Sequence, residues 1–481
     1  MNEPKTLQAT EVTTADVDTL MSKLGDTEVQ SALKDFITTV GKKGAVYKVN
    51  PATVDQCISD IDAIISAQMD AILHDKDFKA LEASWRGLQT LVQGATFERP
   101  VRFALLDISK EELSGDFEGA EEGIETSEFY KKIYQRYNLA GGHPYTAIIS
   151  DYQFSNSAAD IKLLTHMATM GELVQVPFIG NAQPEFFGHT NFNEVIDDRH
   201  LKERMKEDDE YILWNNFRDD DRSKYVGLAM PRFLGRLSYG QGNDETTKSF
   251  NYTEGAKKDS DYLWCNASFA LAKNIIKSFE KWGWSTKVVG TDSGGRVENL
   301  PMPTYDDGGQ KKAKIPIEVA LGMDNEKILC ELGFIPLVHW DRSNYAVFFE
   351  LPSAQRPKVI KDNAEATRDY AVGARLQYVM LVTRIAHYLK YRQLKFVGKN
   401  AGAGEIKADL QKWLDTLVSD VPTADEETAA RYPLRSCEVE VKESEDKPGF
   451  FHVSVTLRPH VSIVGMEVNL RLAAYQEKPK E

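Results

Sequence analysis

The spacing of apolar residues changes twice along this 481-residue chain, and that pattern restricts the folds open to it. Up to about residue 95, apolar side chains recur every three or four positions, which is typical of helices. Short apolar runs then alternate with helical patterns to about residue 360, as they do in α/β domains. A long helical segment and three short alternating segments complete the chain. We therefore predict a mixed α/β (α+β) protein in three parts, 1–95, 96–360 and 361–481.

The first part is expected to form a helical arm. Val17 to Val40 has the pattern of an amphipathic helix, and a Gly/Lys linker joins it to Ala52. Two further helical stripes consist of Val54, Ile58, Ile61, Ile65, Met69 and Ile72, and of Phe78, Leu81, Trp85, Leu88 and Val92. The second stripe has a period of about 3.5 residues, which indicates packing against another helix or a sheet. An intramolecular helical hairpin and a coil that binds a partner are both compatible with it.

Strand and helix patterns alternate in the middle part, which predicts a sheet covered by helices. The expected strands are Val101–Leu106, Tyr145–Ile149, Pro177–Gly180 and Tyr345–Leu351, and the expected helices are Ile161–Val174 and Leu263–Trp282. The run from Asp197 to Arg222 is dense in charges of both signs. We predict that it forms a solvated helical face, which the apolar group Tyr211–Trp214 anchors to the core.

The last part combines a basic helix with a small antiparallel sheet. Ala364 to Val397 is expected to be one helix of roughly 50 Å, at 1.5 Å per residue, and Glu405 to Val418 a shorter one. Three strands are predicted at 437–441, 451–457 and 468–472, with a turn at Asp446–Gly449 between the first two. A short sheet at a chain end has exposed edges, which must be covered or paired.

Charge and cysteine content limit the class of protein. The 58 Lys and Arg residues against 73 Asp and Glu residues leave a net charge of −15, which argues against binding of nucleic acid or anionic membrane by the whole surface. Nowhere do roughly 18 apolar residues follow one another, as a membrane-spanning helix requires. The four cysteines form no C-x-x-C pair, and the start of the chain lacks the order of a secretory signal. These features predict a protein of the reducing cytoplasm.

No catalytic, metal-binding or cofactor-binding motif stands out. Asp292-Ser293-Gly294-Gly295 resembles the segment around the nucleophile of trypsin-like proteases, but the histidine context of those proteases is missing here. The sequence also lacks a G-x-x-x-x-G-K-[ST] phosphate loop and an H-E-x-x-H zinc motif. His387 is expected to be a packed imidazole inside the long helix rather than a ligand. We therefore expect neither an enzyme nor a cofactor; a cytosolic hydrolase using Ser293 is the alternative from another class.

An ordered set of short motifs resembles the large sheath subunit of bacterial type VI secretion systems, the TssC/VipB family. In the first two parts these motifs are Leu81-Glu82-Ala83-Ser84-Trp85-Arg86-Gly87-Leu88, Gly141–Tyr145, Ser150–Phe154, Tyr225–Leu234, Gly294–Pro301 and Gly333–Leu337. In the last part they are Arg384–Lys390, Tyr432–Arg435, Lys447–Gly449 and Leu457–His460. One such motif would be weak, whereas the ordered set, from about Phe78 to Leu472, is highly specific.

The resemblance implies a contractile-sheath fold and a structural role in the bacterial cytoplasm. Members of the family pair with a small sheath subunit (TssB/VipA-like) and polymerise into a helical sheath around an inner tube of Hcp-like rings. The sheath assembles on a baseplate, contracts to propel the tube, and is dismantled by a ClpV-like AAA+ unfoldase. Neither nucleic acid nor membrane insertion is implied. The sheath of a phage-tail-like particle is a related alternative.

The resemblance also directs attention to two surfaces. Strand addition by the small subunit is predicted at Val439, Val441, Val453, Val455, Leu457, Val468 and Leu470. Contact of the basic helix with the inner tube is predicted at Arg384, Lys390, Arg392 and Lys395. Exposed charge pairs are individually weak, about 0–1 kcal/mol each, which suits a contact that must release during contraction.

Overall fold

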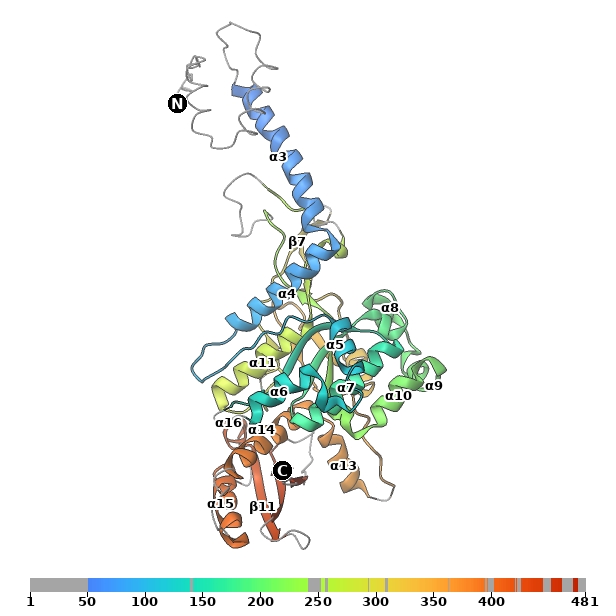
Figure 1. Cartoon of the computed structure of the whole chain (residues 1–481). Helices are drawn as coiled ribbons and strands as arrows, with labels where there is room; N and C mark the ends of the chain where they lie inside the picture. The colour runs from blue at the N-terminus through green and yellow to red at the C-terminus, as the bar shows by residue number, and fades with distance from the viewer. Residues whose placement is uncertain are drawn as a thin grey trace. The chain divides into compact units, whose positions relative to one another are not determined.

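The computed structural model describes residues 51–138, 142–240, 252–255, 258–292, 294–307, 310–361, 363–393, 396, 402–419, 421, 425–443, 451–460 and 470–474 (Figure 1). The chain divides into two compact units, one made of Met1–Asp75 with Ser238–Gly255 and one made of Lys76–Leu237 with Ala256–Glu481. The helix expected at Val17–Val40 lies outside the described residues. The three-part division expected from the sequence stays a prediction.

The smaller unit is built on helix α3 (Pro51–Leu73), which confirms the first of the two helical stripes. The end of this helix holds a segment that is far away in the sequence. The hydroxyl group of Tyr252 donates to the Asp70 carboxylate at 2.6 Å, and the N–H group of Gly255 donates to the same oxygen at 3.3 Å. Polar contacts therefore join the last turns of α3 to the segment around Tyr252.

A six-stranded sheet forms the centre of the larger unit, in the strand order β1-β2-β3-β9-β10-β6. These strands are β1 (Ile148–Phe154), β2 (Phe178–Ala182), β3 (Val226–Met230), β9 (Ile335–His339), β10 (Ala346–Phe348) and β6 (Arg296–Val297). The pairings from β1 to β9 are parallel, and the two pairings of β10 are antiparallel. The strands expected at Pro177–Gly180 and Tyr345–Leu351 are confirmed, and the strand expected from Tyr145 begins at Ile148.

Two hydrophobic cores lie on opposite faces of this sheet, and β2 contributes alternately to both. Phe178 belongs to the core with helix α7 (Ala158–Val174), and Ile179 belongs to the core with helix α11 (Ala267–Trp282). Both side chains are buried, as expected for parallel strands that helices cover on each face. Both predicted helices are thereby confirmed. Helix α4 (Lys76–Gln93), which carries the second stripe, packs on α11.

Shorter elements complete the middle of the larger unit. They are α5 (Lys110–Glu118), α6 (Glu128–Asn138), α8 (Phe192–Asp197), α9 (Leu201–Glu207), α10 (Ile212–Asp219), α12 (Met323–Glu331) and the ribbons β4–β5 (Phe233–Leu234 with Trp264–Cys265) and β7–β8 (Thr304–Asp307 with Gln310–Ala313). Tyr211 and Trp214 are fully buried, and the Trp214 ring stacks on Phe334 at 5.5 Å. The charged run around α9 and α10 is therefore anchored by Tyr211 and Trp214, whereas the other two residues of the predicted group, Ile212 and Leu213, are 50% and 49% exposed.

The strand predicted at Val101–Leu106 is wrong. These residues form neither strand nor helix, and Leu105 is 71% exposed. Within the described part of the chain, β1 is an edge strand that pairs only with β2, and the segment does not join its open side. An apolar run shows that a segment suits a strand, but it does not show that a neighbouring strand is available.

The single basic helix predicted from Ala364 to Val397 is also wrong, because the chain forms two helices there. They are α13 (Ala364–Gly373) and α14 (Leu376–Gln393). The break arises from hydrogen bonds to the segment 351–353: the N–H group of Ser353 donates to the Ala374 carbonyl and the N–H group of Leu376 donates to the Leu351 carbonyl, both at 2.8 Å. Main-chain groups that would continue the helix are therefore used in a bridge to a distant segment.

The chain ends in a helix packed on a small antiparallel sheet, as predicted (Figure 1). Its elements are α15 (Ala403–Asp415), α16 (Glu426–Arg431), β11 (Leu434–Glu443), β12 (Phe451–Pro459) and β13 (Leu470–Ala474), with the strand order β11-β12-β13. In the described part of the chain, none of the helices combines the length and apolar character that crossing a membrane requires.

Candidate interaction surfaces

The inner face of the C-terminal sheet is covered by the chain itself. Val439, Val453, Val455 and Leu457 are at most 6% exposed and share one core with Leu410 and Leu414 of α15. Val441 packs at the rim of this core, and Leu470 lies on β13 opposite Leu457. Val468 lies outside the described residues. A partner strand would therefore meet these strands through their main-chain edges, and the predicted strand addition stays a prediction about those edges.

Three of the four basic residues predicted to meet an inner tube have partners within the chain. They are Arg384 over the Tyr388 ring at 4.9 Å, Lys390 over the Tyr134 ring at 5.4 Å, and Arg392 paired with Asp409 of α15 at 3.0 Å. Lys395 lies outside the described residues. Part of the positive charge of helix α14 therefore lies against aromatic rings or an acidic side chain of the same chain. Contact of this helix with a tube stays a prediction.

His387 on α14 is a packed imidazole, as the sequence predicted. Its Nε2 atom lies 3.2 Å from the carbonyl oxygen of Val174 at the end of α7. Burial lowers the pKa of His387 to about 4, while the carbonyl acts in the opposite direction. The ring is therefore neutral at pH 7, and because a carbonyl only accepts, Nε2 carries the proton and donates it.

An apolar groove of about 1010 Å³ lies beside the open edge of the large sheet. Its walls come from α11, α14 and the irregular segments 100–103 and 142–147. Ile149 of β1, Ile276 and Phe279 of α11 line its interior. Tyr388 and Tyr391 border it and remain 39% and 62% exposed. Exposed aromatic side chains around an apolar groove are typical of a surface that receives a partner chain.

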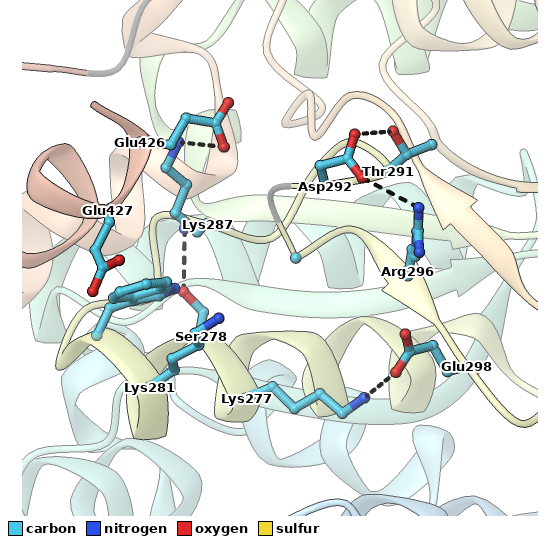
Figure 2. Close-up of a pocket in the computed structure, with 12 residues that line it drawn as sticks. Lys277, Ser278, Lys281, Lys287, Thr291, Asp292, Arg296, Glu298, Glu426 and Glu427 are labelled. Carbon is cyan, nitrogen blue, oxygen red and sulfur yellow. Dashed lines mark hydrogen bonds and ion pairs between the residues drawn. The ribbon is translucent and has the colours of Figure 1, made fainter. Parts of the chain in front are cut away.

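A smaller polar pocket of about 430 Å³ lies between α11, the 291–298 segment and α16 (Figure 2). Its ion pairs are Lys277 with Glu298 at 3.6 Å, Lys287 with Glu426 at 3.8 Å, and Arg296 with Asp292 at 3.2 Å. Figure 2 shows the basic and acidic side chains of these pairs pointing toward one another, so the positive and negative charges that line the pocket balance. Ser293, the alternative nucleophile, lies outside the described residues. Among the side chains that the structure does describe, no cluster suited to a metal ion is found.

A polar cluster joins α4 to β1, and sequence reasoning missed it. Asp151 on β1 accepts hydrogen bonds from the Ser84 hydroxyl of α4 and from Nδ2 of Asn266, the latter at 2.7 Å. Burial raises the pKa of Asp151, while both hydrogen bonds act in the opposite direction. Ser84 and Asp151 both lie within the motifs quoted above, so those motifs were the available signal. Their contact depends on the tertiary fold and cannot be read from spacing.

Strand edges that are unpaired in the described part of the chain, together with an apolar groove bordered by exposed aromatic side chains, are typical of a protein that assembles with other chains. The model of the EvpB/VC_A0108 tail sheath N-terminal domain matches residues 55–355, and the model of the tail sheath gpW/gp25-like domain matches residues 365–475. The type VI secretion system sheath protein TssC1 of Pseudomonas aeruginosa is 35% identical over 437 residues, which cover 89% of this chain and 87% of that protein. The chain belongs to this tail sheath family, TssC/VipB, which confirms the resemblance and the mixed α/β fold class.

A solved structure titled as the anti-feeding prophage baseplate also resembles the chain. The match covers 66% of this chain and 65% of the other, slightly less than two thirds of its length. The TM-score is 0.35 and the sequence identity is 8%.

Proposed function

We propose that this chain is the large, force-generating subunit of the contractile sheath of a type VI secretion system. The observation that carries the proposal is the succession of two tail sheath domains along one chain. Work would come from the free energy of protein–protein contacts, stored when subunits assemble and released when they repack. Such a mechanism requires no cofactor on this chain. A ClpV-like AAA+ unfoldase would dismantle the contracted form at the expense of ATP.

A small sheath subunit of the TssB/VipA type is the proposed partner at the apolar groove. Strand β1 pairs with β2 alone in the described structure, so its outer side offers main-chain groups next to the groove. A partner strand could pair with β1 while apolar side chains cover Phe103, Leu105 and Leu106, which are 38–71% exposed. Burying apolar surface at about 25 cal/mol per Å² would stabilise the pair.

The C-terminal sheet is proposed to receive a strand of the small subunit, as predicted from the sequence, and thereby to link neighbouring subunits. Strands β11 and β13 are its outer strands in the described structure, and a strand from another subunit can add to either edge through main-chain hydrogen bonds. Repetition of this link would give a helical polymer of the chain with its small subunit. A shared strand also keeps subunits connected while they move during contraction.

The remaining partners follow from the proposed sheath. An Hcp-like inner tube would lie against α14 through Arg384, Lys390, Arg392 and Lys395. A baseplate would nucleate the polymer. Assembly would take place in the bacterial cytoplasm, without direct insertion of this chain into a membrane and without nucleic acid.

Negative-stain electron microscopy tests the proposal most directly. The full chain is expressed alone and together with the product of the adjacent small-subunit gene. We expect hollow tubules only on co-expression, because the groove and the sheet edges need the second protein. Soluble, monodisperse protein in both preparations would reject obligate sheath assembly. Labelling of Ser293 by a fluorophosphonate would then be the next measurement.

A further inference from the structure

The outer edge of β11 is closed over its first half by the chain itself. The N–H group of Leu434 donates to the Leu417 carbonyl at 3.1 Å, and the N–H group of Ser419 donates to the Leu434 carbonyl at 3.0 Å. These bonds form a parallel bridge. An irregularity between Leu434 and Ser436 then shifts the register with β12, so that the main-chain groups of Cys437 and Val439 face the open side.

Gln411 on helix α15 covers those next groups with its side-chain amide. Its Oε1 accepts from the N–H group of Val439 at 3.0 Å, and its Nε2 donates to the carbonyl oxygen of Cys437 at 3.2 Å. The amide orientation is fixed because a main-chain N–H group can only donate and must therefore face Oε1. Nε2 also donates to Asp415 at 2.7 Å, which holds the amide in place.

This pair of bonds is the one that a residue of a parallel neighbouring strand would form. In a parallel ladder, one residue accepts from and donates to the two residues that flank its partner. Gln411 bonds to Cys437 and Val439, which flank Glu438. A side chain thus takes the place of a strand residue opposite Glu438, and no partner strand can pair there while it stays.

We propose that the Gln411 side chain limits how far a partner strand can pair along β11, a role that we call a register stop. This inference rests on the proposed strand sharing between sheath subunits. On this edge a partner strand is confined to the stretch from Val441 to Glu443, and longer pairing is directed to β13. Register is weakly specified on an open strand edge, because a strand can slip along it. A stop at Val439 specifies where pairing begins.

Hydrogen exchange of the Val439 amide in the full-length, unassembled chain tests the first step. Gln411→Ala removes both bonds, and Lys412→Ala is the matched control because Lys412 is an exposed neighbour on the same helix. We expect exchange at Val439 to become at least about tenfold faster in Gln411→Ala and to stay unchanged in Lys412→Ala. Equal exchange in wild type and Gln411→Ala would show that the amide does not close the edge.

Exchange in the co-expressed sheath tests the stop itself. In wild-type tubules, the Glu443 amide should exchange more slowly than in the unassembled chain. The Val439 amide should exchange at the same rate in both, because Gln411 already protects it. In Gln411→Ala tubules, protection should extend to Val439 and the tubules should become irregular. Further protection of Val439 in wild-type tubules would overturn the stop, because a partner strand would then have displaced Gln411. Absence of tubules from both proteins would refute the sheath proposal, and the unassembled chain would still decide whether Gln411 closes the edge.

Discussion

The carboxylate of Glu82 on helix α4 accepts two hydrogen bonds from the guanidinium group of Arg236, at 2.7 and 3.1 Å. The Arg236 side chain is 4% exposed and the Glu82 side chain 14%, so little water screens the pair. The pair ties α4 to the segment that follows β4. Removal of one member of a buried ion pair destabilises more than the pair itself stabilises, because the charge that remains is still desolvated and loses this interaction.

We expect Glu82→Ala to lower the free energy of unfolding of the larger unit by about 3 kcal/mol. The combined replacement of Glu82 and Arg236 by leucine should cost less, because the desolvated charge of Arg236 is then removed as well and only the more exposed Arg86, 3.4 Å from Glu82, loses this carboxylate. Urea unfolding followed by tryptophan fluorescence measures both. Glu118→Ala is the control, since the ion pair of Glu118 with Lys162 is half exposed on both sides and should contribute little. Equal losses for Glu82→Ala and Glu118→Ala would contradict the prediction.

Gly87 allows α4 to lie directly on α11. A Cβ atom at this position would stand 2.3 Å from Cδ2 of Phe269, closer than carbon atoms can approach. Gly87→Ala should therefore lower stability by about 1–3 kcal/mol, despite the higher helix propensity of alanine. Gly115→Ala in α5 is the matched control: nothing lies within 4 Å of its Cβ, so alanine should stabilise the helix by about 0.5–1 kcal/mol. Thermal unfolding should move the two variants in opposite directions.

Elements with a clear apolar period could be predicted from the sequence, because period and length report which side chains one face buries. Helices α7 and α11 are of this kind. The break between α13 and α14 could not be predicted, since it depends on main-chain bonds to the segment 351–353. The irregular course of Val101–Leu106 was missed for a similar reason: pairing depends on a free neighbouring strand, not on the segment alone.

Asp151 is expected to make stability depend on pH. Burial raises the pKa of this carboxyl in the folded chain above its value in the unfolded chain. The folded state therefore binds the proton more tightly, so stability falls as pH rises from the unfolded pKa through the folded pKa and then levels off. At pH 7 the ionised group thus opposes folding.

Asp151→Asn should consequently be as stable as wild type, or more stable, at pH 7, and this difference should shrink on acidification. The asparagine can still accept from Asn266, and its Nδ2 can donate to the Ser84 hydroxyl. Asp151→Ala, which leaves the Asn266 amide without this partner, should lose about 1–3 kcal/mol. Unfolding curves recorded between pH 4 and 7 test this. A constant loss for Asp151→Asn at every pH would mean that its charge is not disfavoured by folding.

The interaction surfaces were only partly predictable from the sequence. Features that depend on neighbouring residues in the chain could be predicted, whereas features that depend on the packing of distant segments could not. Alternation along β11 and β12 predicted one apolar face, and the structure supplies α15 as its cover. The charges on α14 were visible in the sequence, but not that Arg392 is paired with Asp409. Such partners are set by the packing of separate helices. The edge position of Gln411 is likewise a tertiary relationship, which residue spacing does not encode.

The Arg392–Asp409 pair decides how contact between α14 and an inner tube should be tested. Reversal of Arg392 would also break its ion pair with Asp409 of α15. Lys390 is an exposed residue whose ammonium group lies over the Tyr134 ring at 5.4 Å, so we choose it for the charge reversal. We expect Lys390→Glu to weaken co-sedimentation of an Hcp-like tube protein with the sheath about fivefold at low salt, since each charge contact contributes about 0–1 kcal/mol. The difference between Lys390→Glu and wild type should decrease at 0.5 M salt, because salt screens the charges.

Lys407→Glu, a charge reversal at an exposed site on α15, is the control. Equal tube recruitment by Lys390→Glu and wild type at low salt would remove α14 as the contact.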